Sequence, residues 1–155
     1  MEFNDEYYMN EALKLAKEAY DIDEVPIGAV IVHNGEIIGR GYNKRNSLAN
    51  PLGHAEIIAI NEAAGYLKDW RIEECTMYVT VEPCPMCSGA IVQARIPRVV
   101  FGARNKKAGC AGSVINLLQI DALNHQVDIT EGVLQEECSS IMTEFFKRFR
   151  KKAAE

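Results

Sequence analysis

Residues 76–87 read Thr-Met-Tyr-Val-Thr-Val-Glu-Pro-Cys-Pro-Met-Cys, and this stretch decides the fold class. Alternation over Thr76–Val81 predicts a strand, and the apolar segment Cys87–Arg95 that follows has helical spacing. Pro97 ends this predicted helix, and Arg98–Gly102 is a short apolar run typical of a buried strand. Strand, helix and strand in this order predict an α/β fold in which a sheet packs against helices.

The segments on either side extend this pattern toward both ends of the chain. The apolar runs Ile27–Val32 and Ile37–Tyr42 flank Asn34-Gly35, a dipeptide that tolerates the positive φ of a tight turn, and they predict a β-hairpin. Helices are predicted over residues 4–20, with Asn4 or Asp5 as the cap, and over residues 54–67, 113–118 and 133–150, with a further strand over 127–130. We therefore expect helices on both faces of the sheet.

Composition limits the class of protein. A chain of 155 residues that is 48% hydrophobic is long enough for one domain, which we expect to span residues 1–155 with its core at about 5–150. Neither a membrane span nor a signal peptide is visible, which favours the cytoplasm. Of five cysteines, only Cys84 and Cys87 are closely spaced. This pattern favours a metal site or a catalytic thiol over a disulfide framework.

Charge is distributed unevenly along the chain. The net charge of −5 disfavours indiscriminate binding to polyanions. Residues 1–24 nevertheless carry eight acids against two lysines, whereas residues 147–155 carry five cations against one acid. The basic C-terminal tail can bind RNA locally, or it can be a solvated helix end where cations are favourable.

Two short motifs carry the chemistry, and each lies at a predicted helix start. Cys84 and Cys87 form a Cys-x-x-Cys, which brings two thiolates within reach of one ion. His54 would complete three protein ligands and leave the fourth tetrahedral position open, as in catalytic zinc sites. Glu56 lies two residues after His54 and can reach a water at that position without coordinating the metal, so we predict that it carries protons.

The Cys-x-x-Cys alone would fit a structural zinc clip or two buried thiols equally well. The two motifs together are more specific. His-x-Glu, an interval of about 26 residues and Pro-Cys-x-x-Cys match the signature of zinc deaminases. A deaminase of a free base or nucleoside, such as guanine or cytosine, remains an alternative, since it has the same metal site. A non-catalytic zinc-binding subunit would be expected to lack the proton carrier, and Glu56 is present.

Longer stretches resemble one family. They are residues 24–30 (Glu-Val-Pro-Ile-Gly-Ala-Val), 41–43 (Gly-Tyr-Asn), 78–84, 98–103, Asn124-His125 and Phe145-Phe146. With these stretches the chain is similar to bacterial tRNA-specific adenosine deaminases over roughly residues 5–150. The resemblance implies a cytidine-deaminase-like three-layer α/β/α fold with a five-stranded mixed sheet, usually as a homodimer.

The resemblance also implies an activity, which is hydrolytic deamination of adenosine to inosine at the wobble position of a tRNA anticodon stem-loop. One zinc ion per subunit would be held by His54, Cys84 and Cys87, with Glu56 as the catalytic proton carrier. The target base must leave its stack to enter the pocket, which costs less in a single-stranded loop than in a duplex.

Substrate contacts follow from the same resemblance. Asn43 should hydrogen-bond the purine, Val25 and Pro26 should line its pocket, and the backbone around Ala55 and Glu82 should read the reacting edge. The candidates for binding RNA by charge, hydrogen bonds and stacking are Asn105, Lys106, Lys107, Asn124, Phe145, Phe146, Arg148 and Arg150. Asn43 can instead cap a loop, and the adjacent Phe145 and Phe146 cannot face the same side of a helix, so one of them should be core.

Two positions depart from the family pattern. Leu52-Gly53 precedes His54 where Thr-Ala is more usual, and Asn105 stands where many bacterial members have aspartate. Asn105 removes a negative charge from a loop expected near phosphate and ribose. The hypothesis is that this loosens discrimination between RNA and DNA. The remaining histidines and cysteines are expected to be surface or structural residues: His33, His125, Cys75, Cys110 and Cys138.

Overall fold

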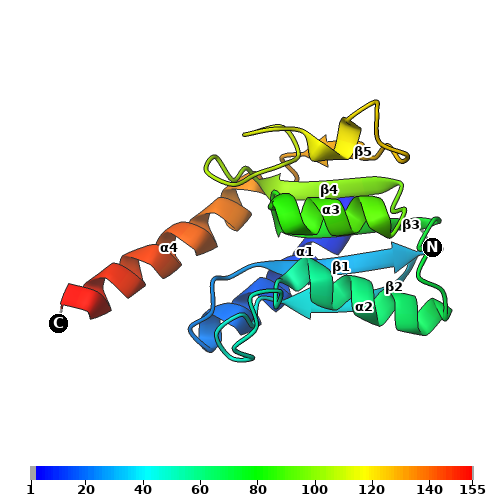
Figure 1. Cartoon of the computed structure of the whole chain (residues 1–155). Helices are drawn as coiled ribbons and strands as arrows, with labels where there is room; N and C mark the ends of the chain where they lie inside the picture. The colour runs from blue at the N-terminus through cyan, green and yellow to red at the C-terminus, as the bar shows by residue number, and fades with distance from the viewer. Residues whose placement is uncertain (1–2, 155) are drawn as a thin grey trace.

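The computed structural model describes residues 3–154, which form a five-stranded mixed sheet with helices on both faces (Figure 1). The strands, in the sheet order β2-β1-β3-β4-β5, are β1 (Gly28–His33), β2 (Glu36–Tyr42), β3 (Cys75–Val81), β4 (Arg98–Ala103) and β5 (Asp128–Glu131). The helices are α1 (Asp5–Asp21), α2 (Ala55–Leu67), α3 (Pro85–Gln93) and α4 (Gln135–Ala154), with a 3-10 turn η1 (Leu117–Gln119). The expected three-layer α/β/α fold with five strands is confirmed.

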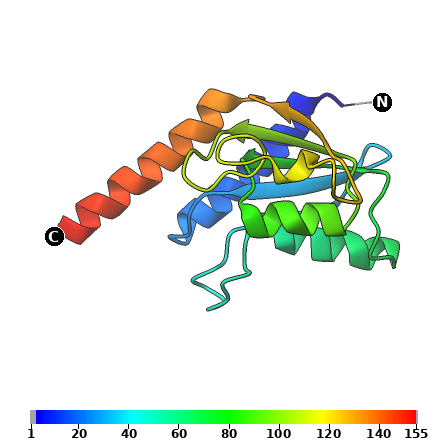
Figure 2. The same cartoon turned by 45° about the horizontal axis from the view of Figure 1, so that its top comes forward.

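One edge of the sheet collects the segments that matter for function. β1 is antiparallel to β2 and β3, whereas β3, β4 and β5 are parallel. Gly28 pairs with Tyr42, and Val81 pairs with Ala103, so the start of β1 and the ends of β2, β3 and β4 meet at one edge. The helices α2 and α3 also begin there, and α4 projects beyond it (Figures 1 and 2).

The alternating side chains of the strands supply two cores. Met77 and Val79 of β3 belong to the cluster under α2 and α3, and Tyr78 between them belongs to the cluster under α1 and α4 (Figure 2). Small residues let α2 lie directly on β2, because a Cβ at Gly41 would meet the carbonyl oxygen of Ala55 at 2.2 Å. The glycines of β2 therefore serve packing.

The boundaries of three elements differ from the predictions. The helix expected over residues 113–118 is wrong: the chain there makes an isolated bridge between Ala111 and Asn116 and then the turn η1. α3 begins at Pro85, two residues earlier than predicted, which suits proline at the first helical turn. α4 begins at Gln135 because Leu134 just before it has a φ of +53°.

No helix within residues 3–154 combines the length and the apolar character that a membrane crossing requires.

A half-buried polar network ties α1 to the sheet. The Asp5 carboxylate accepts hydrogen bonds from Arg98 Nη1 at 3.0 Å, from Arg98 Nη2 at 2.8 Å and from the Tyr78 hydroxyl at 2.7 Å. Arg98 also donates to Thr130 Oγ1 of β5 at 3.1 Å. The Arg98 hydrogen bonds hold the pKa of Asp5 below its usual value, although burial opposes this shift. The network therefore joins α1 with β3, β4 and β5.

Replacing Asp5 with asparagine is expected to lower the free energy of unfolding by about 1 to 2 kcal/mol at pH 7, because the charged hydrogen bonds are only partly shielded from solvent. A lowered folded-state pKa stabilises above the unfolded value of about 3.9, and this contribution is lost as the pH falls through the folded-state pKa. Urea unfolding of both proteins between pH 7 and pH 3 should therefore show a difference that shrinks below about pH 4.

Asp121→Asn is the control, since Asp121 is an exposed carboxylate between η1 and β5. It should leave the free energy of unfolding unchanged. A difference between wild type and Asp5→Asn that stayed constant down to pH 3 would contradict the ionic origin of the stabilisation.

Candidate metal centre and substrate pocket

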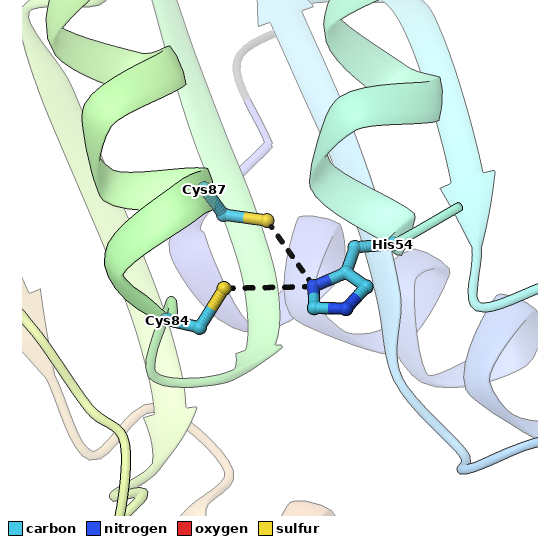
Figure 3. A group of neighbouring side chains, drawn as sticks. All are labelled: His54, Cys84 and Cys87. Atoms are coloured by element: carbon cyan, nitrogen blue, oxygen red, sulfur yellow. Dashed lines mark hydrogen bonds between the residues drawn. The ribbon is translucent and has the colours of Figure 1, made fainter. Parts of the chain in front are cut away.

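The three predicted metal ligands meet where α2 and α3 begin. His54 is the N-cap of α2, Cys84 is the N-cap of α3, and Cys87 lies in the first turn of α3. His54 Nδ1 lies 3.5 Å from the Sγ of each cysteine (Figure 3). All three ligand atoms lie within 4.8 Å of one another. The spacing in sequence thus becomes one cluster in space, as predicted.

The cluster has the dimensions of a zinc site. Zinc–sulfur bonds of about 2.3 Å and zinc–nitrogen bonds of about 2.0 Å at tetrahedral angles place sulfur and nitrogen about 3.5 Å apart. The observed separations of 3.5 Å agree with this value. Three soft or borderline donors with the N-termini of two helices beside them favour thiolate ligands and suit zinc.

The two cysteines shift each other's pKa. Hydrogen bonding with Cys87 lowers the pKa of Cys84 to about 5 against the effect of burial. Hydrogen bonding with Cys84, together with burial, raises the pKa of Cys87. A divalent cation bound by this pair would displace the thiol protons and hold both sulfurs as thiolates.

Glu56 lies beside the cluster in the first turn of α2 and is 4% exposed. Burial raises the pKa of Glu56 to about 7, and hydrogen bonding to its own backbone amide acts in the opposite direction. A carboxyl group with a pKa near neutrality can both accept and donate protons. Glu56 is not one of the three clustered ligands, so its position fits the predicted role of proton carrier.

A cavity of about 110 Å³ opens over the cluster and Glu56. Of the predicted substrate residues, it is lined by Val25, Asn43, Ala55, Glu82 and Asn105. Pro26 is buried and does not line it, whereas Ile27 does. The Ile27 amide donates to the Val25 carbonyl at 2.8 Å, so the chain turns at Pro26, and no sequence pattern pointed to Ile27. Arg45 also lines the cavity and comes from an irregular loop without a predictive pattern.

Asn43 holds the backbone on both sides of the cavity. Its Nδ2 donates to the Val25 carbonyl at 3.3 Å, and its Oδ1 accepts from the Arg45 amide at 3.1 Å. The alternative reading of Asn43 as a loop cap is therefore confirmed. Its contact with a purine stays a prediction.

A larger groove of about 610 Å³ adjoins the cavity and shares Val25, Ile27 and Asn105 with it. Lys106, Lys107, Phe146 and Arg150 line this groove, as expected of residues that bind RNA. Four further lining residues were not expected from the sequence: Val81, Arg104, Met142 and Phe149. Met142, Phe146, Phe149 and Arg150 follow helical spacing, and this spacing could have identified them as one face of α4.

Three predicted RNA contacts lie elsewhere. Phe145 is 4% exposed and packs against Tyr20, so it is the core member of the phenylalanine pair and its assignment to RNA is wrong. Arg148 donates to the Tyr20 carbonyl at 2.9 Å and to Asp23 at 2.8 Å, and its guanidinium lies 4.1 Å from the centre of the Tyr20 ring. Arg148 thus holds α4 against the end of α1 and does not line the groove.

Asn124 lies at the opposite edge of the sheet from the cavity. It is exposed, and it precedes β5, whose first residue pairs with Arg98 at the start of β4. The next residue, His125, forms a hydrogen bond of 2.7 Å through Nε2 with the Ile96 carbonyl. Within one chain, Asn124 therefore cannot join the other substrate residues. Cys75, Cys110 and Cys138 are buried free thiols, as expected.

The comparisons with known proteins agree with this site. Residues 3–150 match the family model described as MafB19-like deaminase. The tRNA-specific adenosine deaminase of Bacillus subtilis is 52% identical to this chain over 148 residues, which cover 96% of the chain and 92% of that protein. A structure solved for a study of A-to-I editing by tRNA:A34 deaminases at the wobble position of transfer RNA has a TM-score of 0.84 and 38% identity, covering 87% of this chain and 98% of that one.

A guanine deaminase from Nitrosomonas europaea has a TM-score of 0.80 over 94% of this chain and 85% of its own, with 22% identity, so it shares the fold. The higher identities belong to proteins described as acting on tRNA, and they bear out the resemblance found in the sequence. The chain belongs to the MafB19-like deaminase family, as a relative of the bacterial tRNA-specific adenosine deaminases.

Proposed function

We propose that this protein hydrolyses adenosine to inosine at the wobble position of a tRNA anticodon loop, with one zinc ion per chain held by His54, Cys84 and Cys87. The observation that carries the proposal is that the small cavity and the larger groove adjoin each other. The small cavity over Glu56 has room for a reacting base, and the adjoining groove offers cations and aromatic rings to the chain attached to that base. A free base would need only the small cavity.

Several residues of the small cavity have a role in this reaction. Bound zinc supplies Lewis-acid activation of the attacking water. Glu56 accepts the two protons of that water one after the other, and delivers the first to the purine ring nitrogen and the second to the departing amine. The bond from carbon to water oxygen forms, the bond to the amine breaks, and ammonia leaves. The backbone at Ala55 and the side chains of Val25 and Asn43 hold the base in place.

The groove accounts for recognition of single-stranded RNA. Arg104, Lys106, Lys107 and Arg150 supply positive charge for phosphates. Phe146 and Phe149 are 43% and 58% exposed, so their faces are available to stack on bases that flank the extruded adenosine. Recognition by stacking suits an open loop, whose bases are free to splay outward.

The deciding experiment compares deamination of a synthetic anticodon stem-loop carrying adenosine at the wobble position with free adenosine, guanine and cytosine. The proposal expects inosine in the stem-loop alone. Turnover of a free base with the stem-loop untouched would move the protein to the deaminases of free bases. The same assay after substitution of both Phe146 and Phe149 by alanine should show a raised KM for the stem-loop.

The assembly and its location belong to the same proposal. We expect a homodimer in the cytoplasm, where tRNA is modified. Apolar side chains that are more than half exposed support a second chain packing on this one: Leu52, Trp70, Val114 and Ile115. Light scattering should give twice the mass of 17.3 kDa for one chain.

Asn105 offers a test of how the protein separates RNA from DNA. Its side chain lies at the junction of cavity and groove, where its Oδ1 accepts a hydrogen bond from the Ala108 amide at 3.1 Å. A carboxylate at this place can accept a hydrogen bond from a ribose 2′-hydroxyl, which DNA lacks. Asn105→Asp is therefore expected to raise the ratio of kcat/KM on RNA to that on DNA hairpins several-fold.

Asn124→Asp makes the same chemical change at the opposite edge of the sheet, so it should leave this ratio unchanged. Equal ratios for wild type and Asn105→Asp would show that the neutral side chain has no part in the discrimination.

A further inference from the structure

Two buried carboxylates beside the cavity have no part in the chemistry described above. Glu24 is 1% exposed and Glu82 is 2% exposed. A buried carboxylate is costly unless its oxygens are well hydrogen-bonded. In both residues the donors are backbone amides and one serine hydroxyl, all from a segment that borders the cavity.

Glu82 organises the segment that follows β4. Its Oε1 accepts from the Asn105 amide at 3.1 Å and from the Ser113 hydroxyl, and its Oε2 accepts from the amides of Ala111 and Ser113, each at 3.0 Å. Burial alone would raise the pKa of Glu82, but these hydrogen bonds outweigh it and the pKa is lowered. The segment 104–113 thus folds around one buried carboxylate.

Close packing shows that the segment lies directly on this carboxylate. A Cβ at Gly109 would meet Glu82 Cδ at 2.4 Å and the Asn105 carbonyl oxygen at 2.4 Å. Only glycine fits there without displacing one of them. The same segment carries Asn105 to the junction of cavity and groove and carries Lys106 and Lys107 to the groove.

Glu24 organises the segment between β2 and α2. Its carboxylate accepts from the Asn46 amide at 3.1 Å, from the Ser47 amide at 2.7 Å and from the Ser47 hydroxyl at 2.8 Å. This segment carries Arg45 into the cavity and ends at the ligand His54. Because β2 and β4 lie on either side of β1 and β3, the two segments border the cavity from two sides.

We propose that Glu24 and Glu82 are positioning residues for the nucleic-acid substrate, each holding one of the two segments, 43–53 and 104–113, between which the reacting base enters. The proposal rests on the function proposed above and adds two residues to it. Neither residue touches the reacting atoms. Each acts by presenting Arg45, or Asn105 with Lys106 and Lys107, in the orientation that the RNA requires.

Glu82→Gln tests the role of Glu82 in holding the segment 104–113. The amide group fills the same space, but its NH₂ cannot accept, so at least one backbone amide of the segment loses its partner. Amide exchange within residues 105–113 should become at least about tenfold faster, while residues 46 and 47 stay unchanged. The KM for the stem-loop should rise about tenfold, with zinc content unchanged and kcat within about twofold. The slope of log KM against log salt should fall by about 1 to 2, as Lys106 and Lys107 lose phosphate contacts.

Glu24→Gln is the matched control for the second segment. Its faster exchange should be confined to residues 46 and 47, and its KM should rise with a fall in salt slope of no more than about 1, because Arg45 is the one cation of segment 43–53 that lines the cavity. Ser113→Ala and Ser47→Ala each remove one hydroxyl donor and leave the amide donors in place, so they keep the test open if a glutamine variant does not fold. They should show the same two patterns to a smaller degree.

Faster exchange throughout the chain with an unchanged KM would overturn the proposal, since the carboxylates would then serve general stability. Local exchange at the predicted amides with an unchanged KM would overturn it as well. If wild type fails to act on the stem-loop, the proposed function fails by itself. The exchange patterns would still decide whether each carboxylate holds its segment.

Discussion

Glu56→Ala is expected to reduce turnover of the stem-loop by about 10³- to 10⁴-fold while the protein keeps its zinc, because general acid–base groups contribute up to this amount. The variant removes the buried carboxylate in the first turn of α2, beside the ligand cluster. His54, Cys84 and Cys87 remain in place, and their mutual distances do not depend on Glu56. Zinc per chain, measured by elemental analysis, and initial rates on the stem-loop check the two halves of the prediction.

Glu62→Ala provides the control on the same helix. Glu62 is exposed in the middle of α2, so its loss should change neither rate nor zinc content. Loss of zinc in Glu56→Ala would make Glu56 a ligand and contradict its role as proton carrier. A rate within tenfold of wild type would mean that a group other than Glu56 carries the protons.

The sequence predicted the ligand cluster well because local rules place it. A cysteine pair at the start of α3 and a histidine at the start of α2 are brought to one edge by the order of strands and helices. Alternation in β3 and the Asn34-Gly35 turn suffice to place that edge. None of these inferences depends on a contact between distant side chains.

The errors come from contacts that link distant parts of the chain. Arg148 looked like an RNA contact because it is a cation in a basic helix, but its partners are Tyr20 and Asp23 at the end of α1, which is distant in sequence. Residues 113–118 were predicted as a helix because their apolar spacing allows one. In the structure this part of the chain folds back on itself, with the Gly112 amide donating to the Ile115 carbonyl and Ala111 bridging to Asn116, while Glu82 accepts from the Ser113 amide.

The residues that line the groove were predicted only in part. Phe146 was predicted from resemblance, whereas Phe149 was missed, although both lie on one face of α4. The sequence pattern cannot tell which face of an amphipathic helix packs inward when apolar residues occur on both. The packing of Phe145 decides which face of α4 points inward. Phe145 is buried against Tyr20, and Phe146 and Phe149 therefore face the groove.

Removing the metal should abolish activity and loosen the junction of α2 and α3. The two helices begin at ligand residues, so a bound ion would join them across the edge of the sheet. A ligand that binds only the folded state at about 100 times its Kd stabilises by about 3 kcal/mol. For a chain of this size that corresponds to a fall in Tm of roughly 5 to 10 °C after chelation. Added zinc should restore both the Tm and the activity.

Cys87→Ala should reproduce the chelated state and stay inactive when zinc is added, since two ligands hold the ion much more weakly than three. Cys138→Ala is its matched control, because Cys138 is an equally buried thiol that packs between α4 and β4 on the other face of the sheet. It can lose some stability through the small cavity left behind, but it should keep one zinc per chain and full activity. If chelation lowered neither Tm nor rate, the cluster of His54, Cys84 and Cys87 would not be a metal centre.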